Sequence, residues 1–460
     1  MIDKMNRRQV AFGLTGVAFG GMALYAGTVH APGKKGAFAS TATPKNGGYG
    51  PLQSDPDGLL DLPRGFSYSV LSAHGDMMSD GLLVPDNCDG MGCFRLDERR
   101  IALVRNHELR PESLKKGPAG KDGLREVEAF DHLPGGAALP GGTSTIVLDA
   151  KTLKVEDQYL SLAGTIRNCA GGITPWGSWL TCEEDVTRAG EDGLSQDHGW
   201  VFEVLAGHRG LARPEPIRAM GRFNHEAACV DPATGIAYLT EDRDDSLLYR
   251  FLPHERGALA RGGRLQALAL IDGPADTRNW GTHDFTPGQW AKARWIDLDN
   301  VESPEDDLRQ RGAKAGAALF ARGEGIWFGQ GEFYFCCTSG GSAGLGQVMR
   351  YRTSPVEGQA GEAEAPGQLQ IFVESPDKAM FNYGDNLTIG PNGHLIVCED
   401  QYTHIVDNHL RGVTPDGALY TLAKLRTQTE LAGACFSPDG STLFVNLYSP
   451  GKTLAIRGPW

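Results

Sequence analysis

A β-hairpin plan recurs along the chain and restricts its fold more than any other feature. Each copy has a short apolar run, a proline-centred turn closed by glycine, and a second apolar run, which is the pattern of a β-hairpin. A fifth segment, residues 321–341, has the same plan around a glycine turn without the proline. The four copies with proline occupy residues 168–185 (NCAGGITPWGSWLTCEED), 225–242 (HEAACVDPATGIAYLTED), 384–400 (GDNLTIGPNGHLIVCED) and 431–448 (LAGACFSPDGSTLFVNLY).

The spacing of these hairpins predicts a β-propeller. A four-strand unit repeated every roughly 40 to 50 residues is typical of propeller blades. A two-sheet sandwich would not explain one hairpin plan repeated across the whole chain. Only short segments such as residues 301–316 look helical, with Ser303 as a candidate cap. We therefore expect an all-β fold, a six-bladed β-propeller with loop and short helical insertions, closed by pairing between strands from the two ends of the chain.

We expect the first 39 residues to be a signal peptide and a linker. Arg7 and Arg8 precede a mildly apolar stretch, residues 10–25, as in a twin-arginine signal peptide. We expect the twin-arginine export machinery to carry the folded protein to the periplasm or beyond the cell. Residues 40–460 would form a single β-propeller catalytic domain. No later apolar stretch is long enough to span a bilayer, so no stable membrane insertion is expected, and we expect a monomer.

The charge balance restricts the ligands that such a protein can bind. With 44 basic and 57 acidic residues, the chain has a formal net charge of −13, which disfavours nucleic acid as a recognition partner. An acidic protein that binds an anionic substrate needs metal ions or a few well-placed cationic side chains at its site. The distribution of its carboxylates fits that need.

Aligning the hairpins on their prolines gathers metal-ligand residue types at matching positions. Six residues before the proline lie Cys169, Glu226 and Asp385, whereas the last hairpin has Ala432 there. Glu324 stands at a similar place in the fifth segment. Antiparallel pairing brings both ends of a hairpin together, and the inner strands of a propeller converge on its channel. The candidate metal ligands are therefore Cys169, Glu183, Glu184, Glu226, Glu241, Glu324, Asp385 and Glu399.

This set of side chains points to a metal centre. Close carboxylates repel one another unless protons or cations neutralise them. Oxygen ligands suit calcium, and a thiolate among carboxylates suits iron or zinc. The alternative is that some acids, above all Glu241 and Glu399, cap turns and backbone N–H groups.

Two further side chains and the cysteines complete the sequence-based expectations. Arg322, two residues before Glu324, can grip a tetrahedral oxyanion with two N–H groups, and Asn106, near the end of the strand IALVRNHE, could donate to the same group. Multi-metal hydrolysis of phosphate esters is the chemistry that this combination favours. Of the nine cysteines, Cys88 and Cys93 flank a segment that could close a small disulfide.

The chain resembles the PhoX-type alkaline phosphatases over nearly all of its length after the signal segment. The matching motifs are NCAGGITPWGSWLTCEED, RFNHEA, YLTED, RGEGIW and DNLTIGPNGHLIVCED. The resemblance implies a six-bladed propeller with a cluster of Fe3+ and Ca2+ bridged by an oxo group, the proposed nucleophile. It also implies that Cys169, Glu226 and Glu324 are metal ligands, with the thiolate on iron, and that Asn106 and Arg322 hold the phosphate of small-molecule phosphate esters.

Two other functions fit a propeller with an acidic channel mouth. One is a calcium-dependent lactonase or esterase, which Cys169 and Arg322 argue against. The other is a non-catalytic binding propeller in which calcium serves only as a strut. The leading interpretation is a secreted alkaline phosphatase that hydrolyses phosphate monoesters and releases inorganic phosphate. Which carboxylate takes which metal, and which ester is preferred, are left open by the sequence.

Overall fold

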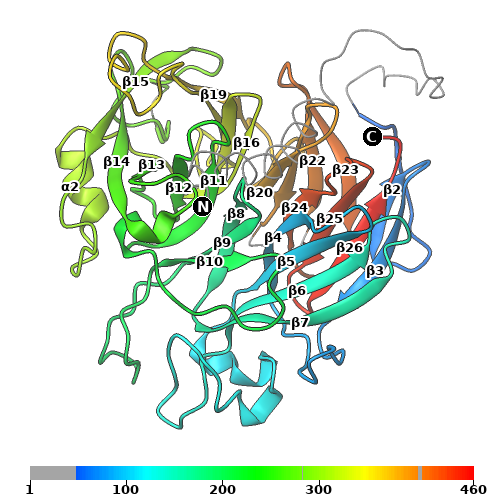
Figure 1. Cartoon of the computed structure of the whole chain (residues 1–460). Coiled ribbons are helices and arrows are strands. Elements are labelled where there is room, and N and C mark those ends of the chain that lie inside the picture. The colour runs from blue at the N-terminus through cyan, green and yellow to red at the C-terminus, as the bar shows by residue number, and fades with distance from the viewer. Residues whose placement is uncertain (1–47, 282, 402–406) are drawn as a thin grey trace, which may run out of the picture. The chain divides into compact units, whose positions relative to one another are not determined.

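Antiparallel strands make up nearly all of the regular structure of the described residues (Figure 1). The computed structural model describes residues 48–281, 283–401 and 407–460, which belong to the unit Pro44–Trp460. The predicted signal segment, residues 1–39, lies outside the described residues. Among the described residues, no helix is both long and apolar enough to cross a membrane.

Five hydrogen-bonded sheets are present in this part of the chain. The first has β4 (Cys88–Arg95), β5 (Arg100–His107), β6 (Gly141–Asp149) and β7 (Val155–Thr165). The second has β8 (Asn168–Ile173), β9 (Ser178–Glu183) and β10 (Val201–Leu205). The third joins β11 (His225–Val230), β12 (Ala237–Glu241), β13 (Tyr249–Pro253), β14 (Gly263–Leu270) and β15 (Ala291–Asp297) to β19 (Gln368–Glu374), β18 (Gln347–Arg352), β17 (Glu332–Cys337) and β16 (Gly323–Gly329).

The other two sheets contain strands from both ends of the described chain. The fourth has β20 (Gly384–Ile389), β21 (Leu395–Glu399), β22 (His409–Val413) and β23 (Leu419–Leu425), extended by β2 (Leu60–Pro63) and β1 (Leu52–Gln53). The fifth has β24 (Leu431–Phe436), β25 (Thr442–Leu447), β26 (Lys452–Arg457) and β3 (Ser67–Ala73). Figure 1 shows the red β26 beside the blue β3. The predicted closure by strands from the two ends is confirmed.

Six strands form an inner ring around which the sheets are arranged. In order of contact these strands are β4, β8, β11, β16, β20 and β24, and β24 contacts β4 again (Figure 1). Glycine allows the close approach at two of these contacts. A Cβ atom at Gly90 would lie 2.5 Å from Ala170 Cα, and one at Gly325 would lie 2.7 Å from Asn386 Cα. The predicted all-β, propeller-like arrangement is thus confirmed.

The count of six blades is not defined by the sheets themselves. The third sheet has nine strands because β15 pairs with β19 through Ala291↔Leu369 and Lys292↔Gln368. This short contact joins two meanders that each start from their own inner strand. The six-bladed count therefore stays a prediction.

The helical segments among the described residues are short and lie in the connections between strands. They are the 3-10 helices η1 (Pro111–Lys116), η2 (Gly120–Asp122), η3 (Arg218–Met220) and η4 (Leu259–Arg261), and the α-helix α2 (Leu308–Lys314). The helix expected over residues 301–316 is therefore shorter than predicted. Ser303 is not its cap, because the Ser303 hydroxyl donates to Asp307 Oδ1 at 2.8 Å and closes a turn ahead of the helix.

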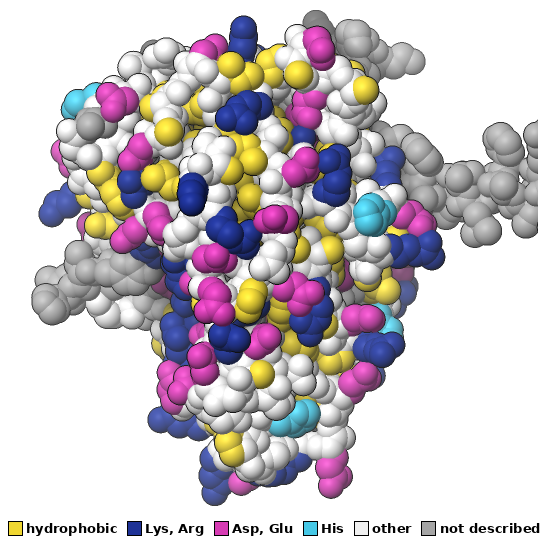
Figure 2. All heavy atoms as spheres, turned by 90° about the vertical axis from the view of Figure 1, so that its left-hand side faces the viewer, with side chains coloured by type: hydrophobic (Ala, Val, Ile, Leu, Met, Phe, Trp, Pro, Cys, Tyr) yellow, Lys and Arg dark blue, Asp and Glu magenta, His cyan; other side chains and the backbone are white. Residues whose placement is uncertain are grey.

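Charged side chains of both signs are interspersed on the face of the molecule drawn in Figure 2. Lysine and arginine side chains stand among aspartate and glutamate there, with apolar side chains between them. That face therefore has no continuous basic stripe of the kind that tracks a phosphate backbone.

Candidate metal centre

The second residue of each inner strand begins the candidate site. In five of these strands the ladder to the next strand is interrupted just after the first residue, and in β24 just after the second. Such bulges re-aim side chains and occur beside active sites. The six residues at this position, in chain order, are Asp89, Cys169, Glu226, Glu324, Asp385 and Ala432. Five of them are metal-ligand types, and the exception, Ala432, is the one that the hairpin alignment predicted.

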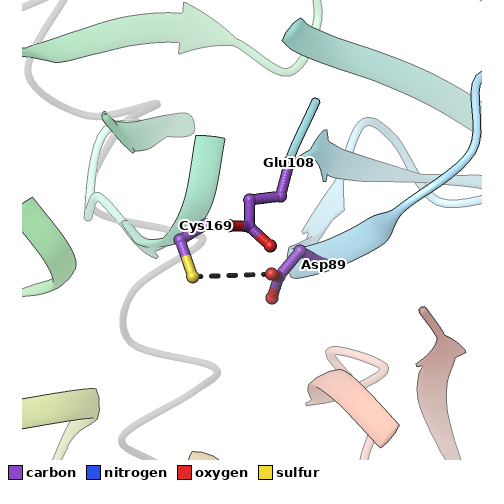
Figure 3. A group of neighbouring side chains, drawn as sticks. All are labelled: Asp89, Glu108 and Cys169. Atoms are coloured by element: carbon purple, nitrogen blue, oxygen red, sulfur yellow. Dashed lines mark hydrogen bonds between the residues drawn. The ribbon is translucent and has the colours of Figure 1, made fainter. Parts of the chain in front are cut away.

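Three groups of side chains bring possible ligand atoms within 4.8 Å of one another. Figure 3 shows the first group, in which the Cys169 thiol donates to Asp89 Oδ2 at 3.5 Å and Glu108 lies beside them. The second group contains Cys169, Glu184 and Glu226, and the third contains Glu226, Glu324 and Asp385. Cys169 and Glu226 each belong to two groups, so the three form one continuous cluster.

The cluster contains buried carboxylate oxygens that have no donor in hydrogen-bonding geometry among the described residues. Among the described residues, both oxygens of Glu226 and Oδ1 of Asp89 are buried without a partner in hydrogen-bonding geometry, although the Cys169 thiol is close to Glu226. Burial, followed by the charges of Asp385 and Glu184, raises the pKa of Glu226 well above its usual value. An uncompensated buried charge costs several kcal/mol. Oxygen-rich donors with one thiol therefore fit calcium together with iron or zinc.

Other members of the cluster also have raised pKa values. Burial and the charge of Asp400 raise the pKa of Asp385 to about 7. Burial raises the pKa of Glu184 to about 8, against the lowering effect of Arg167. Burial, then Asp89 and Glu226, raise the pKa of the Cys169 thiol well above its usual value. A thiolate at this place needs positive charge beside it, which a bound metal ion would supply.

Three predicted ligands, Glu183, Glu241 and Glu399, lie outside these groups. Their side chains hold the start of the next strand. Glu183 accepts hydrogen bonds from His198 Nδ1 at 2.8 Å and from the N–H groups of residues 199 and 200. Glu241 accepts from the Tyr249 hydroxyl at 2.7 Å.

Glu399 is bound most fully of the three. It accepts from Arg411 Nε at 2.7 Å, from His409 Nδ1 at 2.8 Å and from two backbone N–H groups. In this structure Glu183, Glu241 and Glu399 hydrogen-bond to the following strand and lie outside the three groups, so their role as metal ligands stays a prediction. The physical reason for their position is strand alternation. Each of these residues pairs with the first residue of the inner strand, and the residue that follows it turns towards the cluster, as Glu184 does.

Sequence reasoning missed Asp89 and did not choose Glu108. Asp89 lies in β4, whose hairpin lacks the proline turn on which the alignment depended. Its signal was its place one residue after the start of the strand, which only the register reveals. Glu108 directly follows β5, as Glu184 directly follows β9. Cys88 and Cys93, considered for a disulfide, are both free thiols.

Arg322 lies beside the cluster, and its role in holding phosphate stays a prediction. Its backbone has a left-handed φ of 54°. Its guanidinium donates to both carboxylate oxygens of Asp242, at 2.7 and 2.8 Å, and its Nη2 lies 3.3 Å from Glu324 Oε1.

The side-chain N–H groups of Asn106 bind backbone carbonyl groups and do not face an open site. Its side-chain N–H groups donate to the carbonyl oxygens of Cys169 at 3.1 Å and Ala170 at 2.7 Å, and its oxygen accepts from Trp179 Nε1. The predicted contact with phosphate would require breaking one of these bonds. In this structure Asn106 holds the strand that carries Cys169.

Asn106 belongs to a set of three side chains that tie one unit to the next. The Thr240 hydroxyl donates to the Glu324 carbonyl at 2.6 Å, and Asn446 Nδ2 donates to the Asp89 carbonyl at 2.5 Å. Each donor lies in the second strand of one unit, and each acceptor is a residue of the cluster in the neighbouring unit. The backbone of the inner ring is thus fixed directly beneath the ligand-type side chains.

Comparison with known proteins identifies the family of the chain and supports its fold. The family described as alkaline phosphatase PhoX matches residues 47–149 and 142–451. None of the curated protein sequences matches the chain significantly. Among solved structures, Pseudomonas fluorescens PhoX in complex with vanadate, a transition state analogue, superposes with a TM-score of 0.65 at 19% identity, over 87% of this chain and 96% of that one. This match supports the fold.

Two other solved structures superpose far less well. A gluconolactonase from Xanthomonas campestris has a TM-score of 0.40 at 15% identity, over 89% of this chain and 98% of that one. A luciferin-regenerating enzyme has a TM-score of 0.41 at 10% identity, over 86% of this chain and 96% of that one.

Proposed function

Because this chain belongs to the alkaline phosphatase PhoX family, we propose that it is a metal-dependent phosphatase that hydrolyses phosphate monoesters and releases inorganic phosphate. The observation that carries the proposal is the continuous cluster around Cys169 and Glu226. Three of its buried oxygens, both of Glu226 and Oδ1 of Asp89, have no partner in hydrogen-bonding geometry among the described residues, and the cluster lies where six inner strands meet.

The metal ligands that we propose are the members of the three groups. They are Asp89, Glu108, Cys169, Glu184, Glu226, Glu324 and Asp385. The Cys169 thiolate would bind Fe3+ and the carboxylates would bind Ca2+ as well as iron. When bound, these ions would supply neutralisation of the phosphoryl oxygens and an activated oxygen nucleophile, so that no serine or threonine of the chain is needed.

Arg322 would bind the phosphoryl group of the substrate. Its guanidinium is now shared between Asp242 and Glu324. Cations on Glu324 would weaken that carboxylate as an acceptor, and a phosphate dianion would then compete well for the same N–H groups. Asp242 would keep the guanidinium oriented through its two hydrogen bonds, and Asn106 would hold the Cys169 backbone.

We also propose the finer features of architecture and location. Six inner strands, five of which carry a ligand-type residue at the same position, support six blades, with the β15–β19 contact linking two of them. The paired arginines near the N-terminus support a twin-arginine signal and linker over residues 1–39, with residues 40–460 as the catalytic domain of a monomer working in the periplasm or outside the cell.

Hydrolysis of p-nitrophenyl phosphate by purified variants tests the assignment. Cys169→Ala, Glu226→Ala and Arg322→Ala should each lose most of the activity, and the first two should also lose bound metal. Cys229→Ala removes a buried thiol outside the cluster and is the matched control, with activity close to wild type. Full activity in all three site variants would contradict the site, and a wild-type protein that holds iron and calcium yet leaves phosphate esters intact would contradict the function.

A further inference from the structure

We propose that Arg167 is a second arginine that binds the phosphoryl group of the substrate, together with Arg322. The inference rests on the proposed phosphatase function and adds a catalytic residue to it. It starts from the positions of the two arginines in the inner ring.

Arg167 and Arg322 occupy equivalent positions in two units. Each stands two residues before a ligand-type residue, Cys169 in one case and Glu324 in the other. Both have left-handed backbones, with φ of 46° and 54°. This conformation costs a non-glycine residue about 1 kcal/mol or more and is concentrated at functional sites.

The same conformation recurs at two more equivalent positions. Asn87 and Tyr383, two residues before Asp89 and Asp385, have φ of 49° and 51°. The left-handed turn is therefore a feature of the ring rather than an accident of one loop. It gives Arg167 the same relation to its inner strand as Arg322 has.

The contacts of Arg167 place it over the first two ligand groups. Its Nε donates to Glu108 Oε1 at 2.7 Å, its Nη2 lies 2.5 Å from Glu184 Oε2, and its Nη1 donates to the Glu184 carbonyl at 2.7 Å. Glu108 shares one group with Cys169 (Figure 3), and Glu184 shares another with Cys169. Arg322 contacts Asp242, which directly follows β12 as Glu108 directly follows β5, and it also contacts Glu324. The two arginines thus border the cluster from different units.

The exposure of Arg167 and the number of its N–H donors favour a role in binding the substrate over a role in only neutralising the neighbouring carboxylates. The side chains of Arg167 and Arg322 keep 19% and 24% of their surface exposed. A guanidinium has five N–H donors, and in the described part of the chain Arg167 uses three of them. Cations on Glu108 and Glu184 would weaken both as acceptors. The phosphoryl group spreads its charge over three oxygens in the transition state, which two guanidinium groups can share.

Equilibrium binding of inorganic phosphate, measured by calorimetry on the metal-loaded protein, tests the proposal. Arg167→Lys keeps the charge and loses the planar fork, so it should weaken phosphate binding roughly 10- to 100-fold while iron and calcium per chain stay at the wild-type level. Arg352→Lys is the control, because Arg352 is an exposed arginine that pairs with Glu332 and lies outside the three ligand groups. This variant should bind phosphate as wild type does. Unchanged phosphate binding in Arg167→Lys, or a loss only in proportion to lost metal, would overturn the proposal.

A crystal structure of the wild-type protein with vanadate provides a test without a variant. At least one guanidinium nitrogen of Arg167 should lie within hydrogen-bonding distance of a vanadate oxygen. Vanadate bound while Arg167 contacts only Glu108 and Glu184 would overturn the proposal and leave the phosphatase function intact. A wild-type protein that binds neither metal nor vanadate would instead refute the phosphatase function.

Discussion

Replacing Glu226 by glutamine should stabilise the metal-free protein at alkaline pH. Burial and then the charges of Asp385 and Glu184 raise the pKa of Glu226 well above 4.5, and in the described part of the chain neither of its oxygens has a partner in hydrogen-bonding geometry. The native state therefore binds this proton more tightly than the unfolded state does. The free energy of unfolding consequently falls as the pH rises from 4.5 through the raised native pKa, and the penalty is complete above that pKa.

The size of the effect follows from the cost of a buried charge without a partner, about 3–5 kcal/mol. Glutamine keeps the shape of the side chain and removes its charge. In the presence of a chelator, Glu226→Gln should exceed wild type by about 2–4 kcal/mol in free energy of unfolding at pH 8, and by less than about 1 kcal/mol at pH 5. Urea unfolding followed by tryptophan fluorescence measures both differences.

A matched control separates this effect from a general response to losing a carboxylate. Glu399 is equally buried but accepts hydrogen bonds from Arg411 and His409, so Glu399→Gln should destabilise the protein at both pH values. With iron and calcium restored, wild type should again be more stable than Glu226→Gln, because metal binding stabilises the native state. A chelated Glu226→Gln protein that is no more stable than wild type at pH 8 would refute the reasoning.

Two further predictions concern residues that support the cluster. Thr240→Val removes the hydroxyl that donates to the Glu324 carbonyl and should weaken calcium binding by about 1 kcal/mol, whereas Thr240→Ser keeps the hydroxyl and should restore the calcium affinity. Calcium titration measures the affinity of both variants. Equal affinities in the two variants would argue against a role of the Thr240 hydroxyl in supporting the cluster. Burial lowers the pKa of His198, but Glu183 and Asp131 outweigh it and raise that pKa to about 10. The stability that charged His198 contributes should be complete below pH 6.5 and lost as the pH rises through about 10. His198→Gln should therefore be less stable than wild type by about 3 kcal/mol at pH 7, and the difference should shrink towards pH 10. Thermal unfolding measures this difference, and a value that does not change between pH 7 and 10 would contradict the prediction.

Local signals in the sequence were sufficient for the repeated hairpins. The proline and glycine turns mark β8–β9, β11–β12, β20–β21 and β24–β25, because those residues fix the backbone of the turn. The alignment that they allow identified Cys169, Glu226 and Asp385 as equivalent, and all three lie in the cluster. The β4–β5 hairpin has no such turn, so Asp89 was missed.

Register and long-range contacts account for the remaining differences. Glu183 and Glu184 are adjacent, and a shift of one residue along a strand exchanges the two faces, so composition alone could not decide which of them reaches the cluster. The role of Asn106 in the structure depends on its hydrogen bond to the backbone carbonyl of Cys169, which lies 63 residues away in the chain. No local pattern indicates that its amide is used by the backbone of the neighbouring unit.

Metal analysis coupled to activity tests the central claim most directly. Purified wild-type protein should contain iron and calcium, lose hydrolysis of p-nitrophenyl phosphate when a chelator removes them, and recover it when both are restored. Glu226→Gln should fail to recover under the same conditions, because its side chain belongs to two of the three ligand groups. Hydrolysis that continues at the wild-type rate after both metals have been removed would contradict the account.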